Sequence, residues 1–306
     1  MLDRRKRLVN RSEEEVLQVV SSLARERECF VFPKTRIADV LDLDRSGLSS
    51  GDYSYGLKAH FDFVVADSNY IPVFAVEYDG PGHNSASSTV RDQRKNLICR
   101  AFRFPLLRIG THEVDYIVRR FTVLSWLVEC WFLEREFLAA QERGEIPFDE
   151  VFDPAFILSE SVESLQKDGI TWPYDISWPA RQALKALARQ GKCVNSLPRV
   201  FCRMSKTIDS VTVIAVVGIG RDLAIYSKVS SEVLQFGAVN AFDVAKSIAI
   251  CEVATKVEQY VDGNSRPVDG ATIQKLVNDL KEVSDSKGDT FEVFGQAWHP
   301  NDIGLT

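Results

Sequence analysis

Three acidic residues, Asp62, Glu77 and Asp79, stand in two segments that have the pattern of strands. Residues 60–67 read HFDFVVAD and residues 72–79 read PVFAVEYD, so polar and apolar side chains alternate before each segment turns apolar. The residues between the segments, SNYI, favour a hairpin connection. We therefore expect the three acids to lie on neighbouring strands of one sheet.

The pairing of the two strands decides whether these carboxylates meet. If Asp67 pairs with Pro72, the residue numbers of antiparallel partners add up to 139, and Asp62 lies opposite Glu77 on the same face. Directly opposed residues have Cα atoms roughly 4.5–5.5 Å apart. Asp79 follows two residues after Glu77 and shares that face. The pattern predicts three carboxylates at one end of the hairpin.

Like charges placed opposite each other destabilise a sheet unless a positive group compensates them. Carboxylate oxygens bind hard divalent cations, and Mg²⁺ needs only one or two carboxylates when phosphate oxygens of a substrate complete its shell. We therefore interpret Asp62, Glu77 and Asp79 as candidate metal ligands. The spacing alone is equally compatible with ordinary solvated strand ends.

The loop and the helix predicted after the second strand contain further candidates. His83 lies in a glycine-rich loop just past the acids, where it could act as a general acid or base, or could hydrogen-bond the backbone. Arg91 is suited to bind a phosphate, whereas Asp92 could simply complement the helix N-terminus. Lys95 shares a helical face with Arg91. A solvated helix face is the alternative interpretation of Lys95.

The first third of the sequence predicts a helix, three strands, a second helix and a fourth strand. Ser12 and Glu15 have the spacing of a capping box at the start of the first helix. Residues 29–33 add a short strand ahead of the hairpin, and residues 42–58 form a polar loop. After the helix of residues 91–102, FPLLRI predicts a buried strand. This order indicates an α/β domain with a mixed sheet.

The rest of the chain is less informative. Residues 113–143 have the pattern of one long helix, whose apolar stripe fits core packing or a dimer seam. Residues 147–179 are rich in turns and aromatic side chains. A hairpin is predicted over 211–229, and amphipathic helices over 241–261 and 272–283.

These patterns divide the chain into three parts. We expect a first domain at 1–110, a long connecting helix at 111–146 and an accessory α+β domain at 147–306. The charge distribution agrees with a division, because residues 1–110 contain 17 Lys and Arg against 15 Asp and Glu, and the remainder contains 20 against 28. The net charge of −6 therefore comes from the C-terminal part.

Composition points to the cytoplasm and away from membranes. The six cysteines are scattered without a CxxC pair, as is typical of reduced thiols. The charged N-terminus has no apolar core of a secretory signal, and no apolar run is long enough for a membrane span. The basic cluster Arg4, Arg5, Lys6 and Arg7 could contact phosphates, or could be a solvated tail.

Four segments together resemble one family of bacterial domains of unknown function within the PD-(D/E)XK nuclease superfamily, close to the very-short-patch-repair endonucleases. The segments are KTRIADVLDLD (34–44), HFDFVVAD (60–67), AVEYDGPGHN (75–84) and RDQRKNLICRAFRFPLLRI (91–109). They agree with that family in order and spacing. The resemblance implies a restriction-endonuclease-like αβββαβ core and phosphodiester hydrolysis that depends on Mg²⁺, with Mn²⁺ as a substitute.

The resemblance also implies roles for individual residues. Asp62 matches the first metal-binding aspartate, and Glu77 matches the acid of the (D/E)XK element. Glu15, or its neighbour Glu14, matches the first-helix acid that supports the metal site. Asp79 departs from the pattern, because the superfamily usually has a lysine there. That departure leaves open which residue activates water.

A cation from the following helix, Lys95 or Arg91, could replace the missing lysine. The sequence therefore predicts a metal-dependent DNA endonuclease in a restriction, phage-defence or repair setting. Nucleic acid is the expected partner, with a second copy of the chain or a defence-system protein as further candidates. The alternative is a catalytically inactive nuclease-fold module that binds nucleic acid or a protein.

Overall fold

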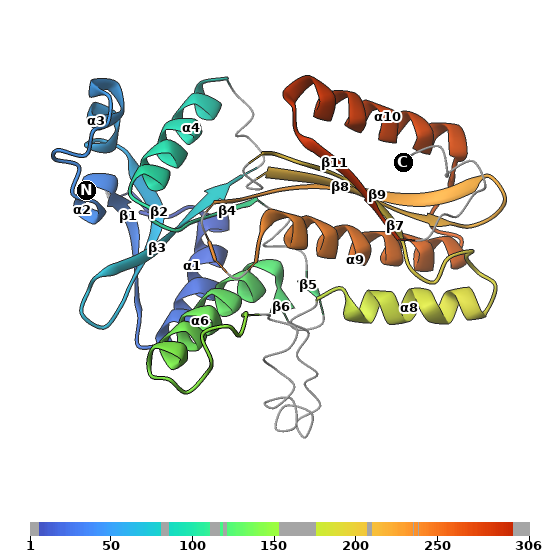
Figure 1. Ribbon diagram of the computed structural model, residues 1–306, viewed down its shortest axis with the longest axis horizontal. Helices are drawn as coiled ribbons and strands as arrows, with labels where there is room; N and C mark the ends of the chain where they lie inside the picture. The colour runs from blue at the N-terminus through green and yellow to red at the C-terminus, as the bar shows by residue number, and fades with distance from the viewer. Residues whose placement is uncertain are drawn as a thin grey trace, which may run out of the picture. The chain divides into compact units, whose positions relative to one another are not determined.

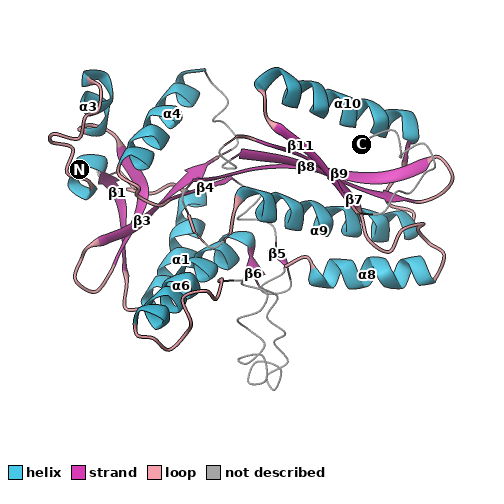
Figure 2. Cartoon of the chain, viewed as in Figure 1, coloured by secondary structure: helices cyan, strands magenta, loops and turns pink. Residues whose placement is uncertain are grey.

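The computed structural model describes residues 6–80, 86–110, 117–118, 121–152, 176–206, 210–234, 236–237 and 239–295. The chain forms two compact units. The first comprises residues 1–152 and 233–239, and the second comprises residues 153–232 and 240–306. Figures 1 and 2 show the helices and strands of both units, which are described separately below.

The first unit is an α+β structure around a mixed sheet, as predicted. Its elements are α1 (Arg11–Arg25), β1 (Phe30–Arg36), α2 (Ile37–Val40), α3 (Ser50–Gly56), β2 (His60–Ala66), β3 (Pro72–Asp79), α4 (Ala86–Ala101), β4 (Leu106–Gly110), β5 (Ile117–Val118), β6 (Phe121–Thr122) and α6 (Val123–Glu142). The strands lie in the order β1-β2-β3-β4. The first three pair antiparallel, whereas β3 and β4 pair parallel through α4. A return of the chain adds Val233 and Leu234 beside β4, which the sequence did not predict.

The hairpin register agrees with the prediction over most of its length. Phe63 pairs with Val76 and Val65 pairs with Phe74, so the partner numbers add up to 139. A bulge after Val65 then shifts the pairing, and Asp67 does not pair with Pro72 as expected. The Asp67 side chain instead accepts hydrogen bonds from two backbone N–H groups of the turn, which explains the local shift.

Helix α1 begins earlier than the sequence suggested. The capping box is formed by Asn10 and Glu13, whose side chains and backbone N–H groups bond reciprocally, and not by Ser12 and Glu15. The buried apolar stripe of the helix consists of Val16, Val20 and Ala24. Glu13 lies on that same stripe, three residues before Val16, and is itself buried.

Two layers of helix cover the sheet of the first unit. In Figure 1, α4 lies on one side of the sheet, and α1 and α6 lie on the other. On the α4 side, Phe61, Ile98 and Leu106 belong to one fully buried cluster. On the α6 side, the Phe74 ring contacts the rings of Trp131, Phe132 and Phe236. This packing fixes the ends of β2 and β3, which contain the predicted acids.

The long helix predicted over 113–143 is shorter in the structure. It begins at Val123, where the Thr122 side chain accepts a hydrogen bond from the Ser125 N–H, and two short strands precede it. The helix packs on α1 and lies within the first unit, which therefore extends past residue 110. Its burial against α1 and Phe74 is the physical reason that it does not act as a separate connector.

The described residues of the second unit form an antiparallel sheet with three helices. Its elements are α8 (Trp178–Arg189), β7 (Arg199–Met204), β8 (Ser210–Gly218), β9 (Leu223–Leu234, in this unit to Glu232), α9 (Ala241–Val261), β10 (Val268–Asp269), α10 (Gly270–Lys287) and β11 (Thr290–Phe294). The strand order is β9-β8-β7-β11, and β10 pairs with β9. The predicted hairpin and the two predicted helices are confirmed, although α10 begins two residues early.

No helix in the described ranges has the length and apolar character needed to cross a lipid bilayer. All six cysteines lie in these ranges, and all are free thiols.

Candidate functional site

The acids at the ends of β2 and β3 open into a pocket of about 430 Å³ within the first unit. Elements α1, β1, β2, β3 and α4 all contribute side chains to it. The lining residues are Glu13, Lys34, Tyr55, Lys58, Ala59, His60, Asp62, Glu77, Tyr78, Asp79, Arg91, Asp92 and Lys95. We call this the carboxylate pocket. It contains most of the residues that the sequence singled out.

Asp62 and Glu77 meet across the hairpin. The Asp62 N–H donates to Glu77 Oε1 at 3.3 Å, and the Tyr78 N–H donates to Asp62 Oδ2 at 2.9 Å. The Glu77 side chain is 6% exposed and that of Asp62 is 19% exposed. The two carboxylates are therefore held by the backbone of the opposite strand, facing one pocket.

Lys95 reaches Glu77 from α4. Its Nζ lies 2.6 Å from Glu77 Oε2 and donates to the His60 carbonyl oxygen at 2.8 Å. The Lys95 side chain is only 9% exposed, and its Nζ lies 5.8 Å from the centre of the Phe61 ring. A positive charge from the helix after the hairpin therefore stands beside the central acid, as the sequence suggested.

Lys34 is a second cation of the pocket, and the sequence analysis missed it. Its Nζ lies 2.6 Å from Asp62 Oδ1 and 3.0 Å from Glu13 Oε1. Lys34 has a φ of 52°, a left-handed conformation that costs free energy in a residue with a side chain. The structure thus places two lysines, one on each acid of the hairpin pair.

The first-helix acid of the pocket is Glu13, which corrects the assignment to Glu15 or Glu14. Glu15 is exposed, and Glu14 forms an ion pair of 2.6 Å with Arg7. The correction follows from the capping residue, because the helix begins after Asn10 and turns Glu13 toward the sheet.

A buried arginine, which the sequence analysis also missed, binds the Asp79 carboxylate. Arg108 of β4 donates to both carboxylate oxygens of Asp79, at 3.1 and 3.0 Å, and to Asp92 Oδ1 at 3.3 Å. Its Nε donates to Asn96 Oδ1 at 2.8 Å, and its side chain is 4% exposed. Asp79 and Asp92 are thus tied to β4 through Arg108, within the same pocket as Asp62 and Glu77.

Burial dominates the electrostatics of Glu77. It raises the pKa of Glu77 to about 7, and the nearby Asp62 charge acts in the same direction, whereas Lys95 and Arg108 oppose it. Burial also raises the pKa of Tyr55 to about 12, assisted by Glu77. For Lys34, burial lowers the pKa, but hydrogen bonds and charge interactions with Asp62 and Glu13 exceed that effect and raise it overall.

The donor chemistry of the pair fits a hard divalent cation in part. Asp62 and Glu77 offer carboxylate oxygens on adjacent strands, which is as many protein ligands as Mg²⁺ needs. Within the described ranges, no group of three His, Cys, Asp or Glu residues is arranged to hold a metal. Asp79, the third predicted ligand, is bound by Arg108. Asp62 and Glu77 are likewise paired with Lys34 and Lys95, so a cation at any of the three acids would share it with a basic side chain.

The remaining predicted residues fall in three groups. Arg91 is exposed on the rim of the carboxylate pocket, one turn before Lys95. Lys6 and Arg7 are exposed at the start of the described chain. His83 lies outside the described residues, as do Arg4 and Arg5, and their predicted roles have no structural counterpart here.

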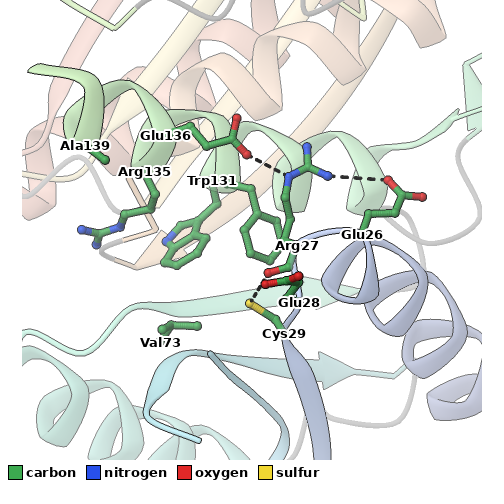
Figure 3. Close-up of a pocket in the computed structure, with 10 residues that line it drawn as sticks. Glu26, Arg27, Glu28, Cys29, Val73, Trp131, Arg135, Glu136 and Ala139 are labelled. Carbon is green, nitrogen blue, oxygen red and sulfur yellow. Dashed lines mark hydrogen bonds and ion pairs between the residues drawn. The ribbon is translucent and has the colours of Figure 1, made fainter. Parts of the chain in front are cut away.

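A larger pocket of about 790 Å³ lies on the α6 side of the same unit (Figure 3). Trp131 and Val73 line it, together with charged side chains that include Arg27 and Arg135. Arg27 forms ion pairs with Glu129 at 2.6 Å and with Glu136 at 3.0 Å. Glu26 also pairs with Arg27, at 3.6 Å, so these acids surround a guanidinium group, and the size of the pocket alone indicates no chemistry.

Part of the chain is similar to a family without an assigned activity. Residues 5–122, less than half of the chain, match the family model described as "Protein of unknown function (DUF2726)". No curated protein and no solved structure matches the chain. The family match contains the whole carboxylate pocket, from Glu13 to Lys95.

Proposed function

We propose that this chain is a metal-dependent nuclease that hydrolyses phosphodiester bonds of DNA in the cytoplasm, with the carboxylate pocket as its active site. The observation that carries the proposal is the buried contact of 2.6 Å between Lys95 and Glu77, beside Asp62. A buried ion pair is costly to desolvate and contributes little to stability, so such a group in a pocket indicates function.

Asp62 and Glu77 are the residues that would hold Mg²⁺ or Mn²⁺. Bound there, the cation would supply a Lewis acid that activates water and offsets negative charge on the phosphoryl oxygens. Burial raises the pKa of Glu77 to about 7 without a cation, and a bound cation would lower it by favouring the ionised carboxylate. Two carboxylates leave the other positions of the cation to water and substrate.

The lysines of the pocket would act on the charge that develops during hydrolysis. Lys95 is fixed by Glu77 and the His60 carbonyl, so its ammonium group is oriented before substrate arrives. Lys34 holds Asp62 in the same way from β1. Arg91, on the rim, is suited to bind a phosphate of the DNA backbone.

The test is cleavage of plasmid DNA and of labelled DNA and RNA oligonucleotides by the full chain with Mg²⁺, with Mn²⁺ and with EDTA. We expect DNA cleavage with either cation and none with EDTA. Glu77→Gln should abolish cleavage, and Glu142→Gln, which changes an exposed acid at the end of α6, should leave it intact. Cleavage at the wild-type rate by Glu77→Gln would contradict the proposal.

A second function has one observation in its favour. Every acid discussed above as a candidate ligand already contacts a basic side chain, so the pocket is neutralised without a cation. A module that binds nucleic acid without cutting it would have the same contacts. DNA binding without cleavage under any of the cation conditions would identify this alternative.

A further inference from the structure

Three aromatic side chains gather at the edge of the first-unit sheet, outside the carboxylate pocket. Phe30 and Phe32 belong to β1, and Tyr70 lies in the turn between β2 and β3; they are 44%, 39% and 66% exposed. The rings of Phe30 and Tyr70 stack with centroids 5.0 Å apart and planes 6° from parallel. The Phe32 ring lies 6.4 Å from that of Tyr70. We call these three side chains the aromatic platform.

The platform is continuous with the carboxylate pocket along β1. The strand register places Phe30 opposite Ala66 and Phe32 opposite Val64, and Lys34 follows between the Pro33–Phe63 and Thr35–Phe61 pairs, opposite Asp62. Lys34 contacts Asp62 at 2.6 Å. Two residues of a strand advance roughly 7 Å. Phe30 and Phe32 therefore form a row along β1 that ends at Lys34, a cation of the pocket.

The exposed edge of β1 is poorly suited to pair with another strand. β1 is the terminal strand of its sheet. Pro33 has no N–H to donate, and Lys34 is in the left-handed conformation, so the ladder of an added strand would be interrupted at both residues. Strand addition by a peptide or by a second copy of the chain is therefore disfavoured, although all three aromatic side chains remain partly exposed.

Exposed aromatic side chains beside the proposed nuclease site match the chemistry of unpaired nucleic acid. Proteins that bind single strands combine cationic groups for the backbone with aromatic side chains on which bases stack. In a duplex the base faces are covered by neighbouring bases, so a platform of this kind discriminates in favour of unpaired segments. Lys34, in ion pairs with Asp62 and Glu13, lies between the platform and the pocket, and Arg91 on the pocket rim is suited to meet phosphates.

We propose that the aromatic platform binds unpaired bases of a single-stranded nucleic acid segment whose backbone continues along β1 into the carboxylate pocket. The substrate class is then nucleic acid with a single-stranded portion, such as a free end or a flap. The inference rests on the proposed nuclease function for its interpretation, but the binding it describes can be measured without any cleavage.

The test is fluorescence anisotropy of the full chain with labelled oligothymidylate, and with a duplex of the same length, in EDTA. We expect tighter binding of the single strand. Tyr70→Ala should weaken that binding roughly 5- to 100-fold, the usual effect of losing one stacking partner, and should affect the duplex less. Phe148→Ala removes a ring that is 78% exposed elsewhere in the unit, and it should change neither affinity.

Two further variants separate stacking from general apolar contact. Tyr70→Phe keeps a ring and should bind the single strand like the wild type. Tyr70→Leu keeps apolar area without a ring and should lose affinity as Tyr70→Ala does. Unchanged single-strand affinity in Tyr70→Ala would overturn the proposal, as would a wild-type protein that binds the duplex more tightly. A change of oligomeric state in Tyr70→Ala, detected by sedimentation, would also overturn it by assigning the platform to a protein interface.

This experiment and the cleavage assay fail independently. If Tyr70→Ala loses single-strand binding and no cation condition gives cleavage, the proposal for the platform is supported and the proposal of a nuclease is rejected. If the wild type cleaves DNA with metal and Tyr70→Ala binds the single strand unchanged, the proposal of a nuclease is supported and the proposal for the platform is rejected.

Discussion

The carboxylate pocket and the larger pocket near Trp131, both in the first unit, differ in size and in the burial of their charged groups. The larger one, near Trp131, has a partly exposed arginine, Arg27, paired with Glu136 and Glu129, whose side chains are 57% and 13% exposed. The smaller one contains Glu77 and Lys95, whose side chains are 6% and 9% exposed. An exposed ion pair has a small desolvation cost and contributes little to stability, whereas a buried pair has a large desolvation cost. Burial of charge, and not cavity volume, therefore identifies the candidate site.

The largest effect should come from the cation of the buried pair. Lys95→Ala should lower the single-turnover cleavage rate at saturating DNA by roughly 10²–10³-fold, because it removes a preorganised charge beside the reacting phosphate. DNA affinity should change far less. Stopped-flow or quench-flow cleavage measures the rate, circular dichroism checks the fold, and Lys192→Ala, on the surface of the second unit, is the control.

The result that would reject a catalytic role for Lys95 is an unchanged rate at saturating DNA combined with a modest loss of affinity that added salt reproduces. Such a pattern would mean that Lys95 contributes only to the general positive field that attracts DNA.

The next effect is on stability and concerns Arg108. Arg108→Met should destabilise the first unit by about 2–4 kcal/mol, because Asp79 and Asp92 lose their buried counter-charge. This loss of unfolding free energy is expected at or below the usual value for breaking a buried ion pair, because both acids are about one-third exposed. Urea unfolding measures it, with Arg25→Met, in the exposed last turn of α1, expected within about 0.5 kcal/mol of the wild type.

A midpoint shift in Arg108→Met no larger than that of Arg25→Met would show that Arg108 does not hold the two acids in solution. Asp79 would then be available as a third ligand of the pocket.

A smaller effect should appear as a pH dependence of stability without metal. Because the folded-state pKa of Glu77, about 7, lies above its ordinary 4.5, the folded protein retains the proton longer than the unfolded chain does. The stabilisation of the folded protein by protonated Glu77 is therefore fully present at acidic pH. It is lost as the pH rises from about 4.5 to about 7, at no more than about 1.4 kcal/mol per pH unit. Glu77→Gln should remove this slope.

Urea unfolding in EDTA, at about pH 5 and about pH 8, measures the slope for the wild type and for Glu77→Gln. The account predicts that the variant gains stability relative to the wild type at the higher pH. An equal difference at both pH values would indicate that Glu77 is ionised in the folded protein throughout this range.

The smallest effect belongs to the larger pocket. Arg135→Ala removes a cation that lies 5.1 Å from the Trp131 ring centre, and it should cost about 0.5–1 kcal/mol of stability. Cleavage should not change. Reduced cleavage in this variant, at a wild-type melting temperature, would mean that the comparison between the pockets is wrong and that the larger one takes part in the activity.

The hairpin was predictable because its information is local. Alternation of side chains and a short turn set the register that brings Asp62 to Glu77, and the register holds despite the bulge near Asp67. Lys95 was also within reach of sequence reasoning, because helical spacing after the hairpin aims it at the strand ends. Its contact with Glu77 itself depends on how α4 packs.

The sequence analysis missed some pocket residues because their contacts are set by tertiary structure, or because two sequence patterns favoured different residues equally. Lys34 meets Asp62 only through the pairing of β1 with β2, which no local spacing reveals. Arg108 gave a usable signal, since a lone arginine in the apolar strand FPLLRI requires acidic partners when buried. Glu13 could have been preferred over Glu15, because it shares the helical face of Val16.

The central claim is that Asp62 and Glu77 hold a divalent cation, and a calorimetric titration of the metal-free full chain with Mn²⁺ tests it most directly. The account predicts saturable binding of one or two ions by the wild type and by Glu142→Gln, and loss of that binding in Asp62→Asn and in Glu77→Gln. Equal Mn²⁺ binding by all four proteins, or none by the wild type, would contradict it.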